Sequence, residues 1–226
     1  MKLIHQQSGI LKRVAYALCL ANMIGLAVGC ASAPPVRYYS LQPQLQSSTV
    51  TGDAPIGLQI ALPQIPESVD RPQLMVRDPA EPQLMYALNA DRWAGSVADE
   101  IGQSLSFYLA GQLGAINVQN LPVVPGSLPV WTVQSNVQQF ELMPGHSALL
   151  DVVWTLKPPS GTRASWICQT RISVPVTQKD ATSVVDGQQQ AIRLLANEMA
   201  RKINPGVVAA DNAMQASVQT RACRES

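Results

Sequence analysis

The sequence predicts a single α+β domain built from short strands and two amphipathic helices. Three observations support this class. Several short segments alternate apolar and polar residues, two longer segments repeat apolar residues every three or four positions, and turns rich in Pro and Gly separate them. The strands come in groups before and between the helices, which is typical of α+β domains. The patterned part is long enough to bury one core of its own.

The chain begins with a segment that resembles a bacterial lipoprotein signal peptide. Three basic residues, the last of them Arg13, precede an apolar stretch from Val14 to Val28, and small residues lead into Cys30. An apolar segment of about 15 residues is short for a membrane span but suits a cleaved secretory peptide. We therefore assign residues 1–29 to the signal peptide and expect the mature chain to begin at Cys30.

Cys30 is the predicted lipidation site. In a lipoprotein, diacylglycerol is attached to this thiol and an acyl chain to the new amine, so several chains hold the protein stably on a membrane surface. Ala27 stands where leucine is usual, and an ordinary signal peptide with a bystander cysteine is the alternative. Ala31, rather than Asp, follows the cysteine, which resembles the signal for export to the outer membrane. We expect an outer-membrane, periplasm-facing lipoprotein with no cofactor besides these covalent lipids.

The net charge argues against nucleic-acid binding, and the cysteine content raises the question of a disulfide. The chain has a formal net charge of +1, and the predicted signal peptide contains three basic residues and no acidic residue. The mature chain is therefore slightly acidic and lacks the basic surface expected of a nucleic-acid-binding protein. Cys168 and Cys223 remain in the mature chain, in an oxidising compartment. They form either a disulfide or a buried free thiol at Cys168 with a second thiol in the tail.

The first structured segments follow the anchor. After Tyr38 and Tyr39, a polar stretch from Gln42 to Pro55 is typical of a linker, so residues 30–56 are expected to be a lipidated N-terminus and linker. The domain is expected over residues 57–204. It starts with alternating apolar residues from Gly57 to Leu62, which predict a half-buried strand.

Two further strands and a helix are predicted next. The strands cover Gln73–Arg77 and Gln83–Leu88, separated by a turn rich in Pro and Asp. An apolar stripe that begins at Trp93 and recurs every four residues predicts a helix over Asp91–Leu113, ending at Gly114. Trp93 is expected to anchor this helix in the core, with lipid contact as the alternative. Glu100, on the same helix, is assigned to a solvated face.

An antiparallel meander and a second helix complete the domain. A separate strand is predicted over Ile116–Leu121, and the meander over Val130–Leu142, Ala148–Lys157 and Ser165–Val174. Apolar residues at spacings of three and four predict a helix over Ser183–Ile203, which Pro205 and Gly206 terminate. Residues 205–226 are small and polar without a period, so a flexible C-terminal tail is expected there.

The order of these features resembles one family. Cys30 is followed by Tyr38-Tyr39-Ser40-Leu41, by short strands, by a predicted helix that carries Asp91-Arg92-Trp93-Ala94, and by a meander and a closing helix. This order is similar to that of the ABC-type transport auxiliary lipoproteins, the PqiC-like family, over about Cys30 to Ile203. The family motif assigns structural roles to Tyr38, Tyr39, Leu41, Arg92 and Trp93. The resemblance implies a mostly antiparallel sheet with two main helices packed on one face.

The resemblance also implies a function. It indicates a docking or adaptor subunit, not an enzyme, that works with an MCE-domain periplasmic protein of an intermembrane lipid transport system. A ring of identical protomers is one form that such an adaptor takes. The alternatives are a periplasmic lipid carrier with an apolar pocket between sheet and helices, and a hydrolase that pairs a serine with His146.

Other chemistry has little support in the sequence. His146 is the one histidine left after removal of the signal peptide, and it lies in a Pro-Gly-His-Ser turn. One histidine and two distant cysteines do not make a recognised zinc motif, so no metal site is predicted. No glycine-rich segment ends in Lys-Ser or Lys-Thr, so the chain has no P-loop. For Tyr38 and Tyr39 we expect a strand, with a place at the lipid headgroups as the alternative.

Overall fold

The computed structural model describes residues 34–43, 56–122, 126, 128–159, 164–207 and 216–225. The predicted signal peptide, Cys30 and most of the predicted linker lie outside these residues. Val36–Ser226 form one compact unit. This unit takes in segments on both sides of residues 57–204, so the domain is larger than the sequence patterns indicate.

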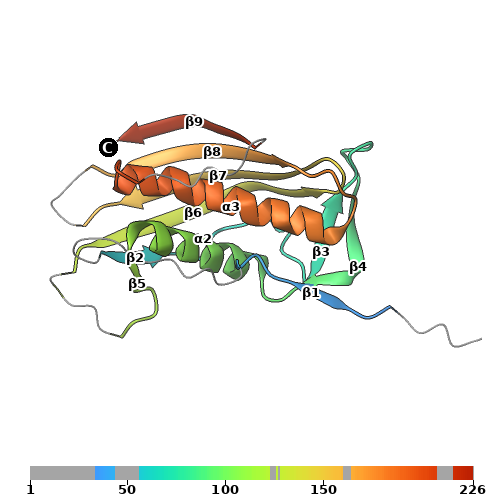
Figure 1. Cartoon of the computed structure of the whole chain (residues 1–226), viewed down its shortest axis with the longest axis horizontal. Helices are drawn as coiled ribbons and strands as arrows, with labels where there is room; N and C mark the ends of the chain where they lie inside the picture. Colours follow the sequence, from blue (N-terminus) through green and yellow to red (C-terminus); the bar gives the residue numbers. More distant parts are fainter. Residues whose placement is uncertain are drawn as a thin grey trace, which may run out of the picture. The chain divides into compact units, whose positions relative to one another are not determined.

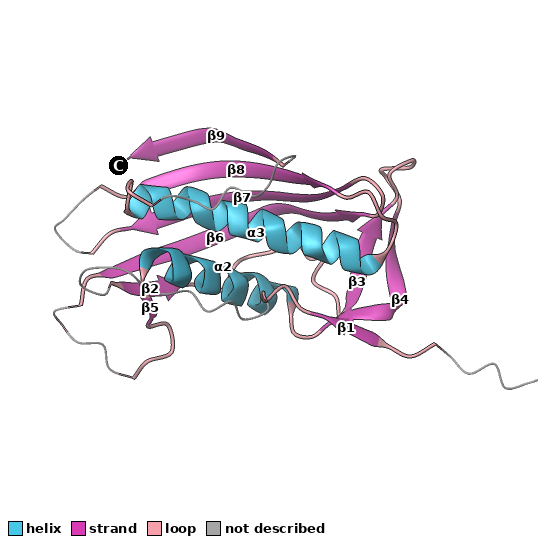
Figure 2. Cartoon of the chain, in the orientation of Figure 1, coloured by secondary structure: helices cyan, strands magenta, loops and turns pink. Residues whose placement is uncertain are grey.

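The unit contains a nine-stranded mixed sheet in which antiparallel pairs predominate (Figures 1 and 2). Its main path runs β1-β4-β3-β6-β7-β8-β9, while β2 pairs with β5 and β6. The strands are β1 (Arg37–Tyr39), β2 (Gly57–Ile60), β3 (Gln73–Arg77), β4 (Met85–Trp93), β5 (Ile116–Asn117), β6 (Val130–Met143), β7 (Ser147–Lys157), β8 (Trp166–Pro175) and β9 (Ser217–Glu225). The meander β6-β7-β8 is antiparallel, as predicted, whereas β1–β4, β2–β5, β2–β6 and β3–β6 are parallel pairs.

Both described helices lie side by side on the same face of the sheet (Figure 1). They are α2 (Val97–Leu113) and α3 (Ala181–Ile203), and α3 crosses β6, β7 and β8. Alternate residues of the central strands point into this layer, so that Trp154, Leu150 and Leu156 are almost fully buried beneath the helices. The predicted α+β class and the placement of the helices on one face are confirmed.

Helix α2 begins later than the sequence pattern indicates. The Ser96 side chain accepts a hydrogen bond from the Asp99 backbone amide, which makes Ser96 the N-cap. Residues from Asp91 to Trp93 instead form the end of β4, where they pair with β1. Trp93 is 4 % exposed and its ring meets Phe140 edge-on, so it belongs to the core but anchors a strand rather than the helix. The predicted helix start at Asp91 is therefore wrong.

Gly114 marks the end of α2, and Asp180 marks the start of α3. Gly114 adopts a left-handed conformation with φ of 62° and its amide donates to the Ala110 carbonyl, so α2 ends where predicted. Asp180 caps α3, since its carboxylate accepts from the Ser183 amide at 2.9 Å. This hydrogen bond is the main reason that the pKa of Asp180 lies below its ordinary value.

Helix α3 packs on the sheet at close range. Gly187 leaves no room for a side chain, because a Cβ atom there would lie 2.8 Å from the Ala148 Cβ. The next residue is the fully buried Gln188, whose Nε2 donates to the backbone carbonyls of Glu141 and Leu149, at 2.9 and 3.0 Å. These bonds satisfy the amide nitrogen of a polar side chain in the core and fix the helix over the β6–β7 pair.

The C-terminal segment contains a strand rather than the flexible tail that we expected. Strand β9 lies at the edge of the sheet, antiparallel to β8 (Figure 1). A disulfide joins Cys168 of β8 to Cys223 of β9. Nearly all β9 side chains are exposed, so the strand lacks the apolar period from which a sequence pattern is recognised.

Candidate functional site

The first candidate site is the junction at which the N-terminal arm enters the domain. Leu41 is fully buried, and its backbone amide donates to Glu100 Oε2 at 2.8 Å. The Ser40 hydroxyl donates to the same oxygen at 2.7 Å. Glu100 is 5 % exposed, so the expectation that it solvates an exposed face is wrong. Its carboxylate binds the arm to α2.

The arm is also fixed to β4 and α3. Gln189 of α3 donates from Nε2 to the Ser40 carbonyl at 2.9 Å. Arg37 Nε donates to Asp91 Oδ1 of β4 at 2.7 Å, and this bond raises the pKa of Arg37 above its ordinary value. The segment that follows the predicted lipid anchor is therefore held by a strand and both helices. We refer to residues 37–42, with Glu100 and Gln189, as the tether junction.

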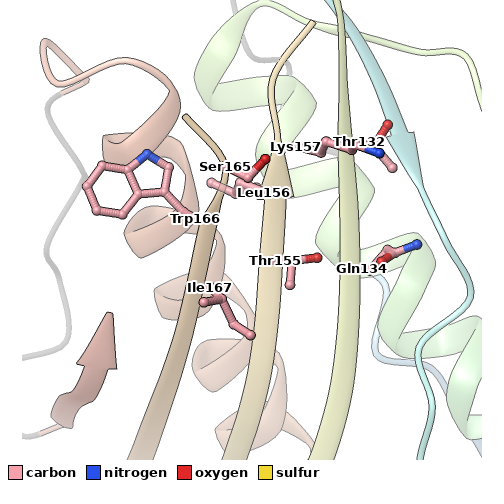
Figure 3. A pocket seen from close by; sticks show the side chains of 8 residues that line it. All are labelled: Thr132, Gln134, Thr155, Leu156, Lys157, Ser165, Trp166 and Ile167. Carbon is pink, nitrogen blue, oxygen red and sulfur yellow. The ribbon is translucent and has the colours of Figure 1, made fainter. Parts of the chain in front are cut away.

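The second candidate site is on the face of the sheet opposite the helices. Because Val133, Leu156 and Cys168 point toward the helices, their neighbours along β6, β7 and β8 point away from them. On this face a hollow of about 390 Å³ is present (Figure 3). It is lined by Thr132, Gln134, Thr155, Leu156, Lys157, Ser165, Trp166 and Ile167.

The hollow differs from the apolar pocket expected of a lipid carrier. It lies outside the sheet, whereas the layer between sheet and helices is occupied by the closely packed core that contains Trp154, Ile192 and Leu195. Its walls are more apolar than polar, with Leu156, Trp166 and the exposed Ile167 beside hydroxyls, an amide and the Lys157 ammonium. Such a surface suits contacts to another protein, which combine apolar area with hydrogen bonds.

Comparison with known proteins identifies the family. Residues 39–200 match the model of the ABC-type transport auxiliary lipoprotein component, which covers most of the chain. The chain belongs to this family. The match spans the end of the tether junction, β2 to β8 and nearly all of α3. No curated protein matches the chain.

Two solved structures share the fold of this auxiliary lipoprotein. One is described as an uncharacterized protein; it is 13 % identical, has a TM-score of 0.58, and the match covers 76 % of this chain and all of the other. The second is protein XCC0632 from Xanthomonas campestris, of the DUF330 family. It is 16 % identical with a TM-score of 0.51, and the match covers 73 % of this chain and 92 % of the other.

Four of the five residues expected to form the family motif lie on β1 and β4, and the fifth, Leu41, follows β1. Tyr38 pairs with Arg92, and Tyr39 pairs with Trp93. Tyr39 is half-buried and packs against the core, whereas Tyr38 is 67 % exposed on the other face of the strand. The expected strand at the two tyrosines is present, and it brings the two parts of the motif together although they are more than fifty residues apart.

His146 lies in the turn between β6 and β7, directly before Ser147, the first residue of β7. His146 Nδ1 is 2.9 Å from Ser147 Oγ, but Ser147 is only 5 % exposed, which does not suit a nucleophile that must meet a substrate. Across the described residues, His, Cys, Asp and Glu do not gather in groups of three that suit a metal ion. None of the described helices is long and apolar enough to cross a membrane.

Glu100 and Gln189 are the functional candidates that the sequence analysis missed. Glu100 lies three residues after Val97 and directly before Ile101, both of which belong to the apolar stripe of α2. A carboxylate at that position lies at the edge of the buried face, and this spacing is the signal that identifies it. The partner of Glu100 is not visible from the sequence, because the arm is about sixty residues away along the chain.

Proposed function

We propose that this auxiliary lipoprotein is the outer-membrane-anchored, periplasm-facing subunit of an MCE-type intermembrane lipid transport system, in the PqiC-like branch of its family. It acts as a docking adaptor. Lipid on Cys30 holds it on the membrane, and the tether junction fixes the domain close to that anchor. The observation that supports an adaptor best is the combination of a firmly bound arm with a sheet face that the helices leave uncovered.

The uncovered face is the proposed docking surface for the MCE-domain protein. Charged side chains on it are largely paired within the chain, as in the Arg171–Asp151 and Arg77–Glu141 ion pairs. The lining of the hollow is more apolar than polar, and it combines Leu156, Trp166 and Ile167 with uncharged hydroxyls and an amide. Ile167 is 49 % exposed. A partner therefore gains hydrogen bonds and apolar contact there with little cost of charge desolvation. A ring of protomers presents several copies of this face to the end of an MCE tube.

Site-specific photo-crosslinking in intact cells tests the docking surface. A photoreactive residue replaces Ile167 in the hollow, and the matched control replaces Leu84, which is 46 % exposed in the turn before β4. We expect an MCE-domain protein to be crosslinked from position 167 and not from position 84. Equal crosslinking from both positions, or none from position 167 in protein that remains membrane-bound, contradicts the proposal.

Membrane fractionation tests the anchor and its location. The unchanged chain is expected in outer-membrane fractions. Cys30→Ala removes the acylated thiol, so the protein should leave the membrane, whereas Ala31→Asp keeps the anchor and should retain the protein in the inner membrane. Membrane association of Cys30→Ala through its own sequence contradicts the anchor, and outer-membrane recovery of Ala31→Asp contradicts the sorting rule for this chain.

A further inference from the structure

The tether junction limits the distance between the domain and the membrane. Arg37, the first residue of β1, follows Cys30 by seven positions. A fully extended chain spans at most about 3.6 Å per residue, so β1 stays within about 25 Å of an acylated Cys30. The surface at the start of β1 is thus the part of the domain that the anchor brings to the lipid headgroups.

This surface exposes apolar and aromatic side chains. Tyr38 is 67 % exposed and Val36, directly before β1, is 44 % exposed, although both belong to a domain with a well-packed core. The neighbouring Tyr39 and Leu41 are half-buried and fully buried. The hydrogen bonds at Ser40 and Leu41 keep the strand from rotating, so Tyr38 cannot turn inward. Tyrosine rings with one polar end are favoured at the membrane–water interface.

This surface contains an arginine without an acidic partner among the described residues. Arg37 is paired with Asp91, so these two residues have no net charge together. Arg92, the register partner of Tyr38 on β4, is partly exposed and forms no ion pair with the described residues, and its buried Nε has no hydrogen-bond partner among them. Arg92 therefore adds one uncompensated positive charge beside Tyr38, which favours contact with anionic lipid headgroups.

We propose that Val36, Tyr38 and Arg92 form a lipid contact surface, which rests on the membrane that holds the anchor, with the Tyr38 ring at headgroup level and Arg92 beside lipid phosphates. This inference rests on the proposed acylation of Cys30. It assigns different roles to the two tyrosines of the family motif. Tyr39 packs the arm onto the core, and Tyr38 contacts lipid, which restricts how the domain rotates about its tether.

Hydroxyl-radical footprinting of the acylated full-length mature protein tests this surface without any substitution. The protein is studied in detergent-free vesicles of phosphatidylethanolamine and phosphatidylglycerol and, for comparison, as the Cys30→Ala chain in solution. Tyr38 should be labelled several-fold more slowly on vesicles. Tyr86, which is 44 % exposed on β4, is the internal control and should be labelled equally in both samples. Equal labelling of Tyr38 in both samples overturns the inference.

A labelled variant gives a second, independent measurement. Tyr38→Cys and the control Tyr86→Cys are modified with a fluorophore, and quenching by brominated lipids is measured on vesicles. Both native cysteines of the described residues are joined in a disulfide, so the new thiol is the one available for labelling there. Stronger quenching at position 38 supports the contact, and equal quenching overturns it. Flotation of both proteins with the vesicles is scored separately, so failure of the anchor is distinguished from failure of the contact.

Discussion

Removal of the disulfide between β8 and β9 should weaken the fold by an amount that follows from the chain length it closes. The bonded cysteines, Cys168 and Cys223, are 55 residues apart. Cross-linking a loop of this length lowers the conformational entropy of the unfolded chain, and the chain-entropy relation gives about 4 kcal/mol at 25 °C. We choose Cys223→Ala as the perturbation, because it leaves at Cys168 a thiol that packs well in a site that is 2 % exposed.

The structure also indicates which part of the fold is weakened most when the disulfide is removed. Cys223 is the only half-buried side chain of β9, so little apolar area holds this strand once the bond is absent. We expect β9 to fray from β8 in the native state of the variant. Fraying lowers the free energy of the native state somewhat, so about 4 kcal/mol is the upper value for the loss.

Equilibrium unfolding in urea, combined with amide hydrogen exchange, measures both effects. The oxidised chain, the reduced chain and Cys223→Ala are compared with Cys30 replaced in each. We expect a lower urea midpoint in the last two, loss of amide protection in β9, and retained protection in β7. A decrease in stability below about 1 kcal/mol together with protected β9 amides would refute the reasoning, because it would show that the strand is held by other contacts.

Substitutions at three further positions test the arm and α3. Glu100→Ala leaves the buried amide of Leu41 without an acceptor, so we expect a loss of about 1–3 kcal/mol in urea unfolding and faster proteolysis of the arm, whereas Glu100→Gln should lose less. Asp180→Asn should melt at a lower temperature than the unchanged chain at neutral pH. The lowered pKa of Asp180 means that its charged form stabilises α3, so this difference should vanish as the pH falls through that pKa. Gly187→Ala should destabilise the protein by about 1–3 kcal/mol despite the better helix propensity of alanine, because the new methyl group clashes with Ala148; an unchanged unfolding midpoint would contradict this.

Sequence patterns predicted the strands and helices whose apolar residues recur at the period of a strand or a helix. Strand β3 matches the predicted range, the meander strands differ from theirs by one or two residues, and both helices end where expected. Each of these elements buries one face against the same core. Apolar residues must then recur at the period of the element, and the sequence shows that period directly.

The start of α2 and the existence of β9 were not predicted because both depend on distant partners. Trp93 continues the apolar spacing of α2 by coincidence, while its true neighbours are Tyr39 across the strand pair and Phe140 in the core. The N-cap at Ser96 is a local signal that correctly marks the helix start. Strand β9 has exposed side chains on nearly all positions, so backbone pairing, Cys223 and the hydrogen bonds of Thr220 hold it in place rather than an apolar face.

The sequence by itself determined the α+β class, the meander, the C-terminal ends of both helices, and the resemblance to the auxiliary lipoprotein family, which the comparison bears out. Only the tertiary structure decided which polar residues have a partner in the fold and which side chains are exposed. It buried Glu100 against the arm, and it left Tyr38 exposed on one face of β1 while Tyr39 packs against the core on the other. It also left the hollow around Ile167 uncovered. The physical reason is that burial and period are properties of neighbouring residues, whereas a hydrogen bond or an exposed face depends on residues brought together from distant parts of the chain.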